Sequence, residues 1–374
     1  MKVAVSRPTP ASKTVGGMSE ELPVGGLPAG VDLLARLEGI CAGRGLARLA
    51  VRLGDMAAFV GGDLEAFEEE FARLPREDAR VGQAASHLLD VGGKRLRPLC
   101  VMLAARVGSG FGPHVMDLAV AVELVHSATL LHDDVVDLSD TRRGLPTART
   151  IYGNAASVFA GDWLLVEALR RVRHSNLPGL LEDLLDTIER MIFAESLQLE
   201  NRGRLTAGRD LYFQVVEGKT ASLFAWAMRA GAVAGGLSEE QVKALSDFGD
   251  NLGVAFQAVD DLLDLTGDVT HTGKELFTDL REGKMTYPLI VALEREPSLR
   301  PLVEEVLALD DESVPESTAR RVLGILRQTG AVEDCRELAR QRTAEAVGRL
   351  ETLPSSRARR ALRTVARAIV DRDL

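Results

Sequence analysis

Aromatic residues are scarce in this chain and make up 4% of its 374 residues, whereas hydrophobic residues as a whole make up 46%. Because aromatic residues favour strands, and because Ala, Leu, Arg and Glu are good helix formers, the composition predicts helix rather than sheet. Strand-like alternation of polar and apolar residues does not persist over more than a few positions. The sequence therefore predicts an all-α protein with ample apolar residues for a large core.

Cysteine is also rare, and Cys41, Cys100 and Cys335 show no CxxC or disulfide-like spacing. This usage is typical of a reducing compartment. The first residues contain no apolar stretch of the kind that signal peptides have. Asp117 and Glu123 interrupt the longest apolar run before it reaches the roughly 18 residues that a membrane span requires. We therefore expect a cytoplasmic protein with at most peripheral membrane contact.

Several motif classes are missing. There is no GxxxxGK[ST] loop and no protein-kinase motif set, which disfavours phosphoryl transfer from nucleotides. There is no nucleophile elbow of a serine hydrolase and no His and Cys pattern for zinc. A net charge of −10 argues against a nucleic-acid partner, although an acidic protein can still carry a local basic pocket for small anions.

Two acid clusters of identical spacing, Asp133–Asp137 and Asp260–Asp264, lie in apolar surroundings. A single Asp pair is most often solvated or at a helix start, but clustered buried charges are costly unless they are paired or bind cations. On a helix the first and fifth residues of each cluster lie about 6 Å apart on one face. Two such faces across one cavity would suit Mg²⁺, whereas the glycine turn and distal glutamate of an EF-hand are missing.

Basic residues gather at the ends of the predicted helices. Each alone would most often be an ordinary solvated side chain, but together they form a plausible set of anion clamps, because Arg binds phosphate through paired hydrogen bonds and Lys adds a point charge. The set is Lys94, Arg97, Arg142, Arg143, Lys219, Lys274 and Lys284. The residues alone thus predict Mg²⁺-dependent chemistry on a phosphorylated and greasy small molecule within a helical bundle.

The start of the chain differs from the rest. Residues 1–30 are rich in Pro, Gly, Ser and Thr and are expected to be disordered. A weak helix is predicted over 31–50, followed by a break at Gly61-Gly62 and a helix over 63–73. The predicted organisation is a disordered extension over 1–30, a weakly helical segment over 31–64 and one large helical domain with a deep central cavity over 65–374.

Longer motifs connect these features. In chain order they are GGKRLRP at 92–98, ELVHSATLLHDDVVD at 123–137, RRGLPT at 142–147, GNAASVFAGD at 153–162, ESLQL at 195–199, GKTASLF at 218–224, FQAVDDLLDLTGD at 256–268, GK at 273–274 and DLREGKMTYPL at 279–289. With these motifs the chain resembles the trans (all-E) polyprenyl diphosphate synthases, and among them the long-chain octaprenyl- and heptaprenyl-type enzymes. The resemblance covers about residues 65–374.

The resemblance implies an all-α bundle around a deep cavity, usually a homodimer. It also implies that isopentenyl diphosphate condenses with an allylic diphosphate such as farnesyl or geranylgeranyl diphosphate, with three Mg²⁺ ions (or Mn²⁺). The implied metal ligands are Asp133, Asp137 and Asp260, supported by Asp134, Asp261 and Asp264. The implied allylic diphosphate site is Arg142, Lys219, Thr220, Gln257, Lys274 and Lys284. The implied isopentenyl diphosphate site is Lys94, Arg97, His126 and Arg143. The residues expected to be catalytic are Asp133, Asp137, Asp260 and Lys219.

His126 alone would most often be a satisfied core histidine. It lies seven residues before Asp133, or about two helical turns, and so faces the same side as the predicted metal site. Together with the motif match, this position favours a role in the site. His132 is adjacent to the cluster but on another face, and we expect it to be structural.

Product length is suggested by small residues on the same helix. On the face of Asp133, Thr129 and Ala128 lie about one 5.4 Å turn before it and Val125 lies about one turn further back, and no aromatic ring appears in this stretch. Short-chain members of the family typically carry Phe or Tyr there, or an insertion in the first cluster. We therefore predict a product of about C35–C50 rather than the farnesyl or geranylgeranyl length, which is the alternative.

Two further alternatives remain. A terpene cyclase shares the first cluster, but its second metal motif usually mixes Asn, Ser and Glu, and it lacks a pocket for a second diphosphate. A non-catalytic subunit of a heteromeric synthase tends to lose metal ligands, and none is lost here. Activity of the purified chain alone distinguishes these readings.

Overall fold

The computed structural model describes Gly39 and residues 47–74, 78–206, 208–266, 276–309 and 314–371. The predicted disordered extension over 1–30 and Lys274 lie outside these residues. The first half of the chain forms α2 (Ala47–Ala72), α3 (Arg80–Asp90), α4 (Leu96–Ala105), α5 (Pro113–Val136), β1 (Thr141–Arg142), β2 (Leu145–Pro146), α6 (Ala148–Tyr152), α7 (Asn154–Ser175) and α8 (Leu180–Glu200). The prediction of an all-α protein is confirmed, with one two-stranded hairpin added.

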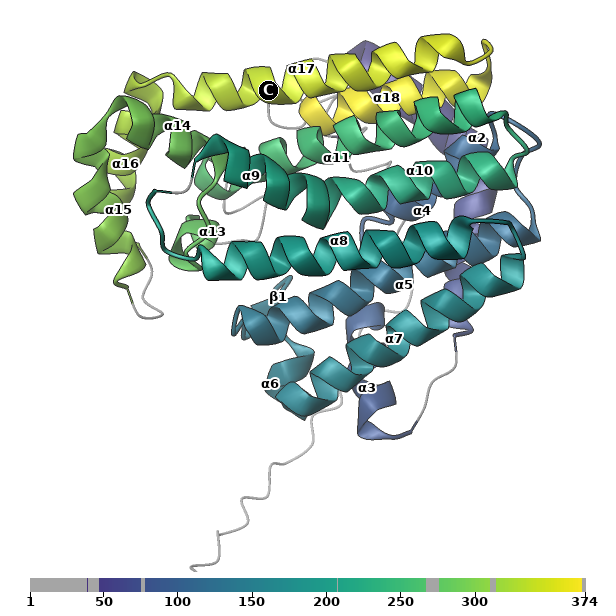
Figure 1. Cartoon of the computed structure of the whole chain (residues 1–374), viewed down its shortest axis with the longest axis horizontal. Helices are drawn as coiled ribbons and strands as arrows, with labels where there is room; N and C mark the ends of the chain where they lie inside the picture. Colours follow the sequence, from purple (N-terminus) through teal and green to yellow (C-terminus); the bar gives the residue numbers. More distant parts are fainter. Residues whose placement is uncertain are drawn as a thin grey trace, which may run out of the picture.

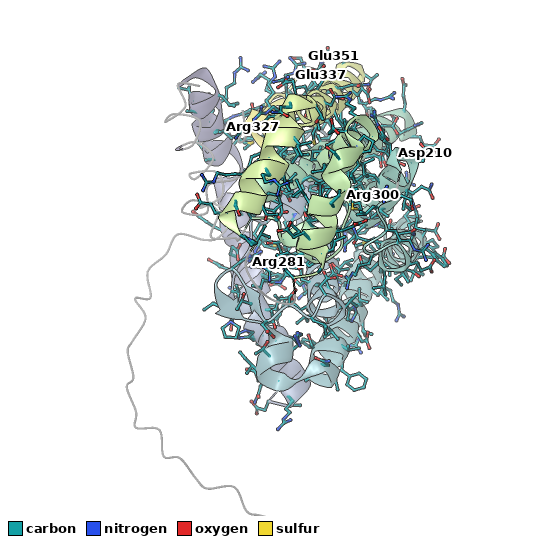
Figure 2. The ribbon with its side chains drawn as sticks, turned by 90° about the vertical axis from the view of Figure 1, so that its left-hand side faces the viewer. Asp210, Arg281, Arg300, Arg327, Glu337 and Glu351 are labelled. Atoms are coloured by element: carbon teal, nitrogen blue, oxygen red, sulfur yellow. The ribbon has the colours of Figure 1, made fainter. Side chains whose placement is uncertain are left out.

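The second half is also helical. It forms α9 (Arg209–Val216), the π-helix η1 (Glu217–Ala221), α10 (Ser222–Ala234), α11 (Glu239–Thr266), α13 (Thr278–Arg281), α14 (Tyr287–Arg295), η2 (Pro297–Leu299), α15 (Arg300–Leu307), α16 (Glu316–Gln328), α17 (Ala331–Arg349), η3 (Leu350–Thr352) and α18 (Arg357–Asp371). Figure 1 shows α7, α5, α8, α10, α11 and α17 following one another across the bundle. Viewed from its end, α15 and α16 stand in front, with Arg300 and Arg327 labelled on them (Figure 2).

α5 is the apolar centre of one half of the bundle. It packs against α7, α4 and α10, and most of its side chains are buried all round. Among the described residues it is also the one helix long and apolar enough to cross a membrane by length and composition, which corrects the expectation that its charges exclude this. However, 72% of its most apolar window is buried inside the protein. A helix that is apolar all round is expected in such a core.

Glycines allow α10 to approach its neighbours closely. A Cβ atom on Gly231 would lie 2.1 Å from the carbonyl oxygen of Val101 in α4, and one on Gly249 in α11 would lie 2.5 Å from the carbonyl oxygen of Phe224 in α10. A side chain at either position would therefore force the helices apart. The close approach fixes how α11, which carries the second acid cluster, sits against α10.

The predicted helix break at Gly61-Gly62 is wrong, because α2 continues through both glycines. The predicted boundary between residues 64 and 65 consequently lies within this helix. Each helical glycine costs about 1 kcal/mol relative to Ala. Burial of Leu53, Val60 and Leu64 in the main core offsets that cost, since burying one such side chain stabilises the fold by about 1.5–3 kcal/mol.

We predict that Gly231→Ala lowers the free energy of unfolding by about 1–3 kcal/mol, because the new methyl group would overlap the α4 backbone. The matched control is Gly62→Ala, where a Cβ would meet nothing within 4 Å. That change should instead stabilise the protein by about 0.5–1 kcal/mol. Urea unfolding of both variants measures the difference, and equal effects would contradict the packing argument.

Candidate active site

The first acid cluster lies at the C-terminal end of α5, and its three carboxylates have three different environments. Asp133 Oδ2 lies 3.6 Å from Lys219 Nζ. Asp134 is 1% exposed, and its Oδ1 accepts hydrogen bonds from Nε and Nη2 of Arg142 at 3.0 and 2.8 Å. Asp137 forms ion pairs with Lys284, at 2.8 Å, and with Arg202. Each acid is thus neutralised by a cation from a different part of the chain.

These environments move the pKa values of the cluster in opposite directions. Burial raises the pKa of Asp133, and the negative charges of Glu195 and Asp137 add to the rise against the opposing charge of Lys219. Burial would also raise the pKa of Asp137, but the positive charges around it, chiefly Lys284, outweigh burial and lower it. The anionic form of Asp133 therefore favours additional positive charge nearby.

The hairpin β1–β2 brings Arg142 back onto the first cluster. Thr141 pairs with Pro146 and Arg142 with Leu145. Arg143 and Gly144 between the strands have positive φ values of 54° and 78°. This is the geometry of a tight two-residue turn, in which the strands fold back directly. Arg142 therefore returns to α5 only eight residues after Asp134.

The second acid cluster lies at the C-terminal end of α11. Asp261 is 2% exposed and accepts hydrogen bonds from the Tyr212 hydroxyl at 2.8 Å, from Gln257 Nε2 at 2.9 Å and from the Tyr287 backbone N–H at 3.3 Å. Burial, followed by the charge of Asp279, raises the pKa of Asp261 to about 7. Its neighbours are hydrogen-bond donors rather than cations, so Asp261 anchors Gln257 and the start of α14.

Asp264 and Asp260 differ from Asp261. Asp264 accepts the backbone N–H groups of Thr278 and Asp279 at 3.0 and 3.2 Å, and so holds the start of α13 beside α11. Asp260 is half-buried, and its charge acts on the Arg97 guanidinium. The second cluster is therefore coupled to the basic residues that follow the diglycine at 92–93.

A π-helical turn connects the two clusters. Lys219 and Thr220 lie in η1, where the helix widens locally, and such turns often occur at functional sites. Lys219 forms ion pairs with Asp133 and Glu195. The Thr220 hydroxyl donates to Gln257 Oε1 at 3.1 Å, and Gln257 in turn donates to Asp261. Polar contacts thus run from Asp133 through η1 to Asp261.

The basic residues predicted for a second anion site also come together. Burial, and then the positive charges of Arg97, Arg142, Arg143 and Arg95, hold the pKa of His126 well below its ordinary value of 6.5. The Arg97 guanidinium lies 4.5 Å from the Phe224 ring centroid, and Lys94 Nζ lies 5.8 Å from that of Phe256. So many positive groups around one neutral histidine are suited to an anion.

Sequence reasoning missed several residues of this region. Arg202, in the loop after α8, reaches Asp137, and Gln198 accepts a hydrogen bond from Lys219 at 3.1 Å. Tyr212 donates to Asp261. Gln198 and Glu195 belong to the ESLQL motif, which could have indicated them, whereas Arg202 and Tyr212 lie outside the quoted motifs.

Among the described residues, no three His, Cys, Asp or Glu side chains lie close enough together to hold a metal ion as they stand. The donor chemistry nevertheless fits Mg²⁺, because both clusters offer carboxylate oxygens. Lys219, Lys284 and Arg202 occupy part of the carboxylate surface. Bringing a divalent cation to this site would require those side chains to give up some of their contacts.

The three residues predicted to set product length lie on α5 as expected. Val125 and Ala128 are completely buried. Thr129 is partly buried, and its hydroxyl donates to the His126 carbonyl oxygen at 2.8 Å. Their side chains are small or short, and α5 contains no Phe, Tyr or Trp.

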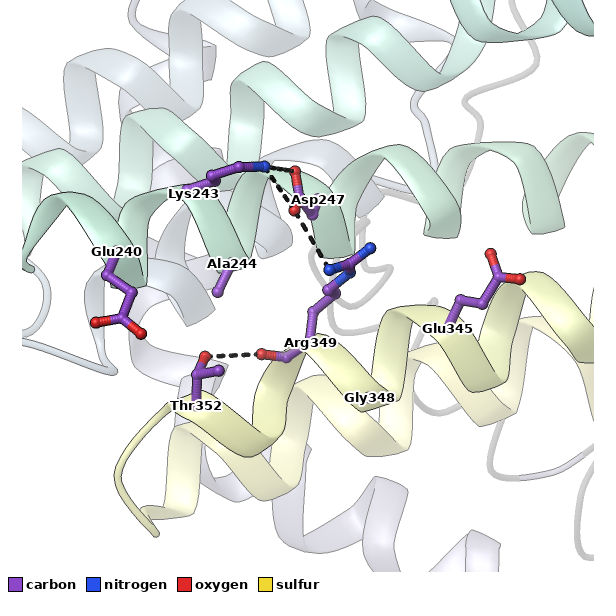
Figure 3. Close-up of a pocket in the computed structure, with 8 residues that line it drawn as sticks. All are labelled: Glu240, Lys243, Ala244, Asp247, Glu345, Gly348, Arg349 and Thr352. Carbon is purple, nitrogen blue, oxygen red and sulfur yellow. Dashed lines mark hydrogen bonds and ion pairs between the residues drawn. The ribbon is translucent and has the colours of Figure 1, made fainter.

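A separate cavity of about 450 Å³ lies at the other end of α11, against α17 and η3 (Figure 3). Arg349 of α17 pairs with Asp247 across it, and Lys243 pairs with Asp247 along α11. It contains none of the predicted site residues. Asp247 and Asp260 are about 20 Å apart along the helix at 1.5 Å per residue, so this cavity is distinct from the candidate site.

Comparisons with known proteins agree with this geometry. The profile of the polyprenyl synthetase family matches residues 78–323. The heptaprenyl diphosphate synthase component 2 of Geobacillus stearothermophilus is 36% identical over 324 residues, which cover 86% of this chain and 100% of that protein.

Solved structures match as well. A polyprenyl synthase from Caulobacter crescentus, complexed with calcium and isoprenyl diphosphate, has a TM-score of 0.79 at 36% identity, covering 85% of this chain and 97% of that one. Geranylgeranyl pyrophosphate synthetase from Pyrococcus horikoshii has a TM-score of 0.78 at 30% identity, covering 85% and 98%. A decaprenyl diphosphate synthase from Rhodobacter capsulatus also has a TM-score of 0.78 at 35% identity, covering 86% and 99%. The backbone therefore matches proteins named for a long and for a short product equally well.

We predict that His126 titrates below 6.5 in the free protein and that its pKa rises when inorganic diphosphate is added, because the anion offsets the surrounding arginines. NMR titration measures both values, and the spectrum of His126→Gln identifies the resonance. Since the folded-state pKa is depressed, protonation favours the unfolded chain, and this contribution to stability should be lost as pH falls below about 6.5. An unchanged pKa with diphosphate would contradict an anion site here.

Proposed function

The chain belongs to the polyprenyl synthetase family and is a prenyltransferase, and from this premise we propose that it condenses isopentenyl diphosphate head-to-tail with an allylic diphosphate in a Mg²⁺-dependent reaction. The observation that supports the proposal most is the continuous polar path between the ends of α5 and α11, from Asp133 through Lys219 and Thr220 to Asp261. It lies beside the basic residues around His126.

In this proposal the acid clusters hold up to three divalent ions through Asp133, Asp137 and Asp260. When bound, the ions would stabilise the negative charge that develops on the departing diphosphate. Asp134 and Asp261 contribute through their partners: Asp134 orients Arg142, and Asp261 orients Gln257. Asp264 holds the start of α13 in place.

The basic residues divide into two groups. Those near the clusters would bind the allylic diphosphate: Arg142, Lys219, Thr220, Gln257 and Lys284, with Lys274 outside the described residues. Those around His126 would bind isopentenyl diphosphate: Lys94, Arg97, His126 and Arg143. Holding both substrates next to each other converts a bimolecular encounter into a positioned reaction.

The proposed reaction breaks one C–O bond, forms one C–C bond and releases one proton. The allylic C–O bond breaks, and inorganic diphosphate leaves with the bonding electrons. The double bond of isopentenyl diphosphate attacks the allylic carbon, so that a new C–C bond forms. This leaves a tertiary carbocation at C3 of the isopentenyl unit, and loss of a proton from the adjacent C2 then forms the new C2=C3 double bond. We propose that the departing diphosphate accepts this proton, so that no protein base is required.

Assembly is part of the proposal. Several large apolar side chains on α7 and α8 are exposed, among them Phe159 at 59%, Ile192 at 61% and Phe193 at 66%. Exposed apolar surface, where it is contiguous, typically marks an interface with another protein. We propose that a second copy of the chain covers it in a cytoplasmic homodimer. The alternative is a complex with a different chain. The name of the Geobacillus relative, "component 2", is consistent with such a complex.

The metal proposal predicts that EDTA abolishes condensation. Asp133→Ala and Asp260→Ala should each lower kcat by about a thousandfold or more, because each removes a ligand of the divalent ions that would stabilise the leaving diphosphate. Glu304→Ala, an exposed acid on α15, is the control and should keep wild-type activity. Turnover is measured with the purified chain and circular dichroism checks the fold. Activity that persists in EDTA, or in both Asp variants, would contradict the metal proposal.

We propose a long product of about C35–C50. The growing chain would extend along α5, each turn of which is 5.4 Å long. The proposal is supported by the small side chains of Val125, Ala128 and Thr129 on α5. The backbone similarity does not help here, because structures named for long and short products match about equally well. The short-chain alternative is a farnesyl or geranylgeranyl product.

Ala128→Phe should shorten the product sharply and retain activity, because the ring would fill the path beside α5. Ala128→Ser, which adds little volume, should keep the wild-type length. Products made from farnesyl diphosphate and excess isopentenyl diphosphate are dephosphorylated and separated by chromatography. If the wild type stops at C20, the long-chain proposal is wrong.

A further inference from the structure

Arg95 has an unusual backbone and an unusual burial for its residue type. It lies directly before α4 with φ of 49°, in the left-handed region that non-glycine residues rarely adopt. Its side chain is 5% exposed. A left-handed backbone is unfavourable for a residue of this kind and persists only where the surroundings hold it.

Two carboxylates and an aromatic ring hold the Arg95 side chain. Its Nη1 donates to Glu123 Oε1 at 2.8 Å and its Nε donates to Glu68 Oε1 at 3.1 Å. Its Cζ lies 4.4 Å from the Phe71 ring centroid. Glu123 belongs to α5, whereas Glu68 and Phe71 belong to α2. α2 ends before residue 78, where the match to the family profile begins.

The ion pair between Arg95 and Glu123 also supports the segment that contains Lys94 and Arg97. A Cβ on Gly93 would lie 3.2 Å from Arg95 Nη1 and 3.2 Å from Glu123 Oε1, so the diglycine backbone packs directly on the pair. Lys94 precedes Arg95, and Arg97 follows it by two residues. The direction in which both basic side chains leave the backbone therefore depends on the left-handed turn at Arg95.

We infer that Glu68 of α2 is a positioning residue for the isopentenyl diphosphate pocket, acting through Arg95 on Lys94 and Arg97. Glu68 touches neither substrate in this assignment. The inference rests on the proposed function, which gives Lys94 and Arg97 to that substrate. It adds α2 to the parts of the chain that hold the pocket in place.

Positioning and net charge make opposite predictions for Glu68. Removing a carboxylate near an anion site makes the local potential more positive, which by itself would tighten binding of a diphosphate. Losing a hydrogen bond that holds Arg95 would instead let Lys94 and Arg97 move and would weaken binding. A variant that removes the carboxylate therefore separates the two effects by the sign of its result.

The experiment measures KM for each substrate, and kcat, with the full-length chain. Glu68→Ala should raise KM for isopentenyl diphosphate by about tenfold, the effect of one hydrogen bond to a charged group, and leave the allylic KM within about twofold. Glu68→Gln keeps an oxygen acceptor for Arg95 and should restore most of the affinity. Glu69→Ala is the matched control, because the Glu69–Arg73 pair on the same helix is 69% exposed on both sides.

Phe71→Leu provides a second route to the same conclusion if Glu68→Ala folds poorly. It removes the ring beside the guanidinium, keeps an apolar side chain, and should also raise KM for isopentenyl diphosphate alone. Lys94→Ala and Arg97→Ala are the reference variants for loss of the pocket. Thermal unfolding of each variant shows whether a change in KM accompanies general destabilisation.

The outcomes separate the inference from the proposed function. If Lys94→Ala and Arg97→Ala raise this KM but Glu68→Ala and Phe71→Leu leave it unchanged, the inference is overturned and the pocket assignment stands. If Glu68→Ala and Glu68→Gln both lower this KM, charge rather than position governs Glu68 and the inference is overturned. If the wild type does not condense the two substrates, the proposed function fails, and the inference fails with it.

Discussion

The constraint on which the rest of the structure depends is the cost of placing carboxylates at the ends of two apolar helices. α5 and α11 both end in their acid clusters, and a helix C-terminus adds partial negative charge of its own. Buried carboxylates at such a site stay ionised only if cations or hydrogen-bond donors lie next to them. The structure meets the need with Lys219, Arg142 and Lys284 at the first cluster and with neutral donors at Asp261.

Several local irregularities of the fold serve this need. The hairpin after α5 returns an arginine to Asp134, and the π-turn η1 places Lys219 opposite Asp133. The loops after α8 and α13 contact each other through Gly203 and Gly283 and bring two cations to Asp137. In a bundle of otherwise regular helices, the departures from regularity therefore concentrate where charge has to be balanced.

The arrangement also separates charged from apolar side chains along α5. Charged groups gather at the ends of α5 and α11, whereas Val125 and Ala128 farther along α5 are completely buried among apolar side chains. A diphosphate head and an apolar tail have opposite requirements. In the proposed reaction, the charged end of α5 would serve the head and its apolar side chains would serve the tail.

The sequence by itself determined the helical class, both acid clusters and most of the basic residues, because helix periodicity and the scarcity of acids in apolar runs are local properties. It failed at Gly61-Gly62, where burial of neighbouring residues outweighs helix propensity. It also missed Arg202 and the Glu68–Arg95–Glu123 contacts, since partners 27 or more residues apart leave no local pattern. Only the tertiary structure decided which cation neutralises which acid, because that depends on how distant helices pack.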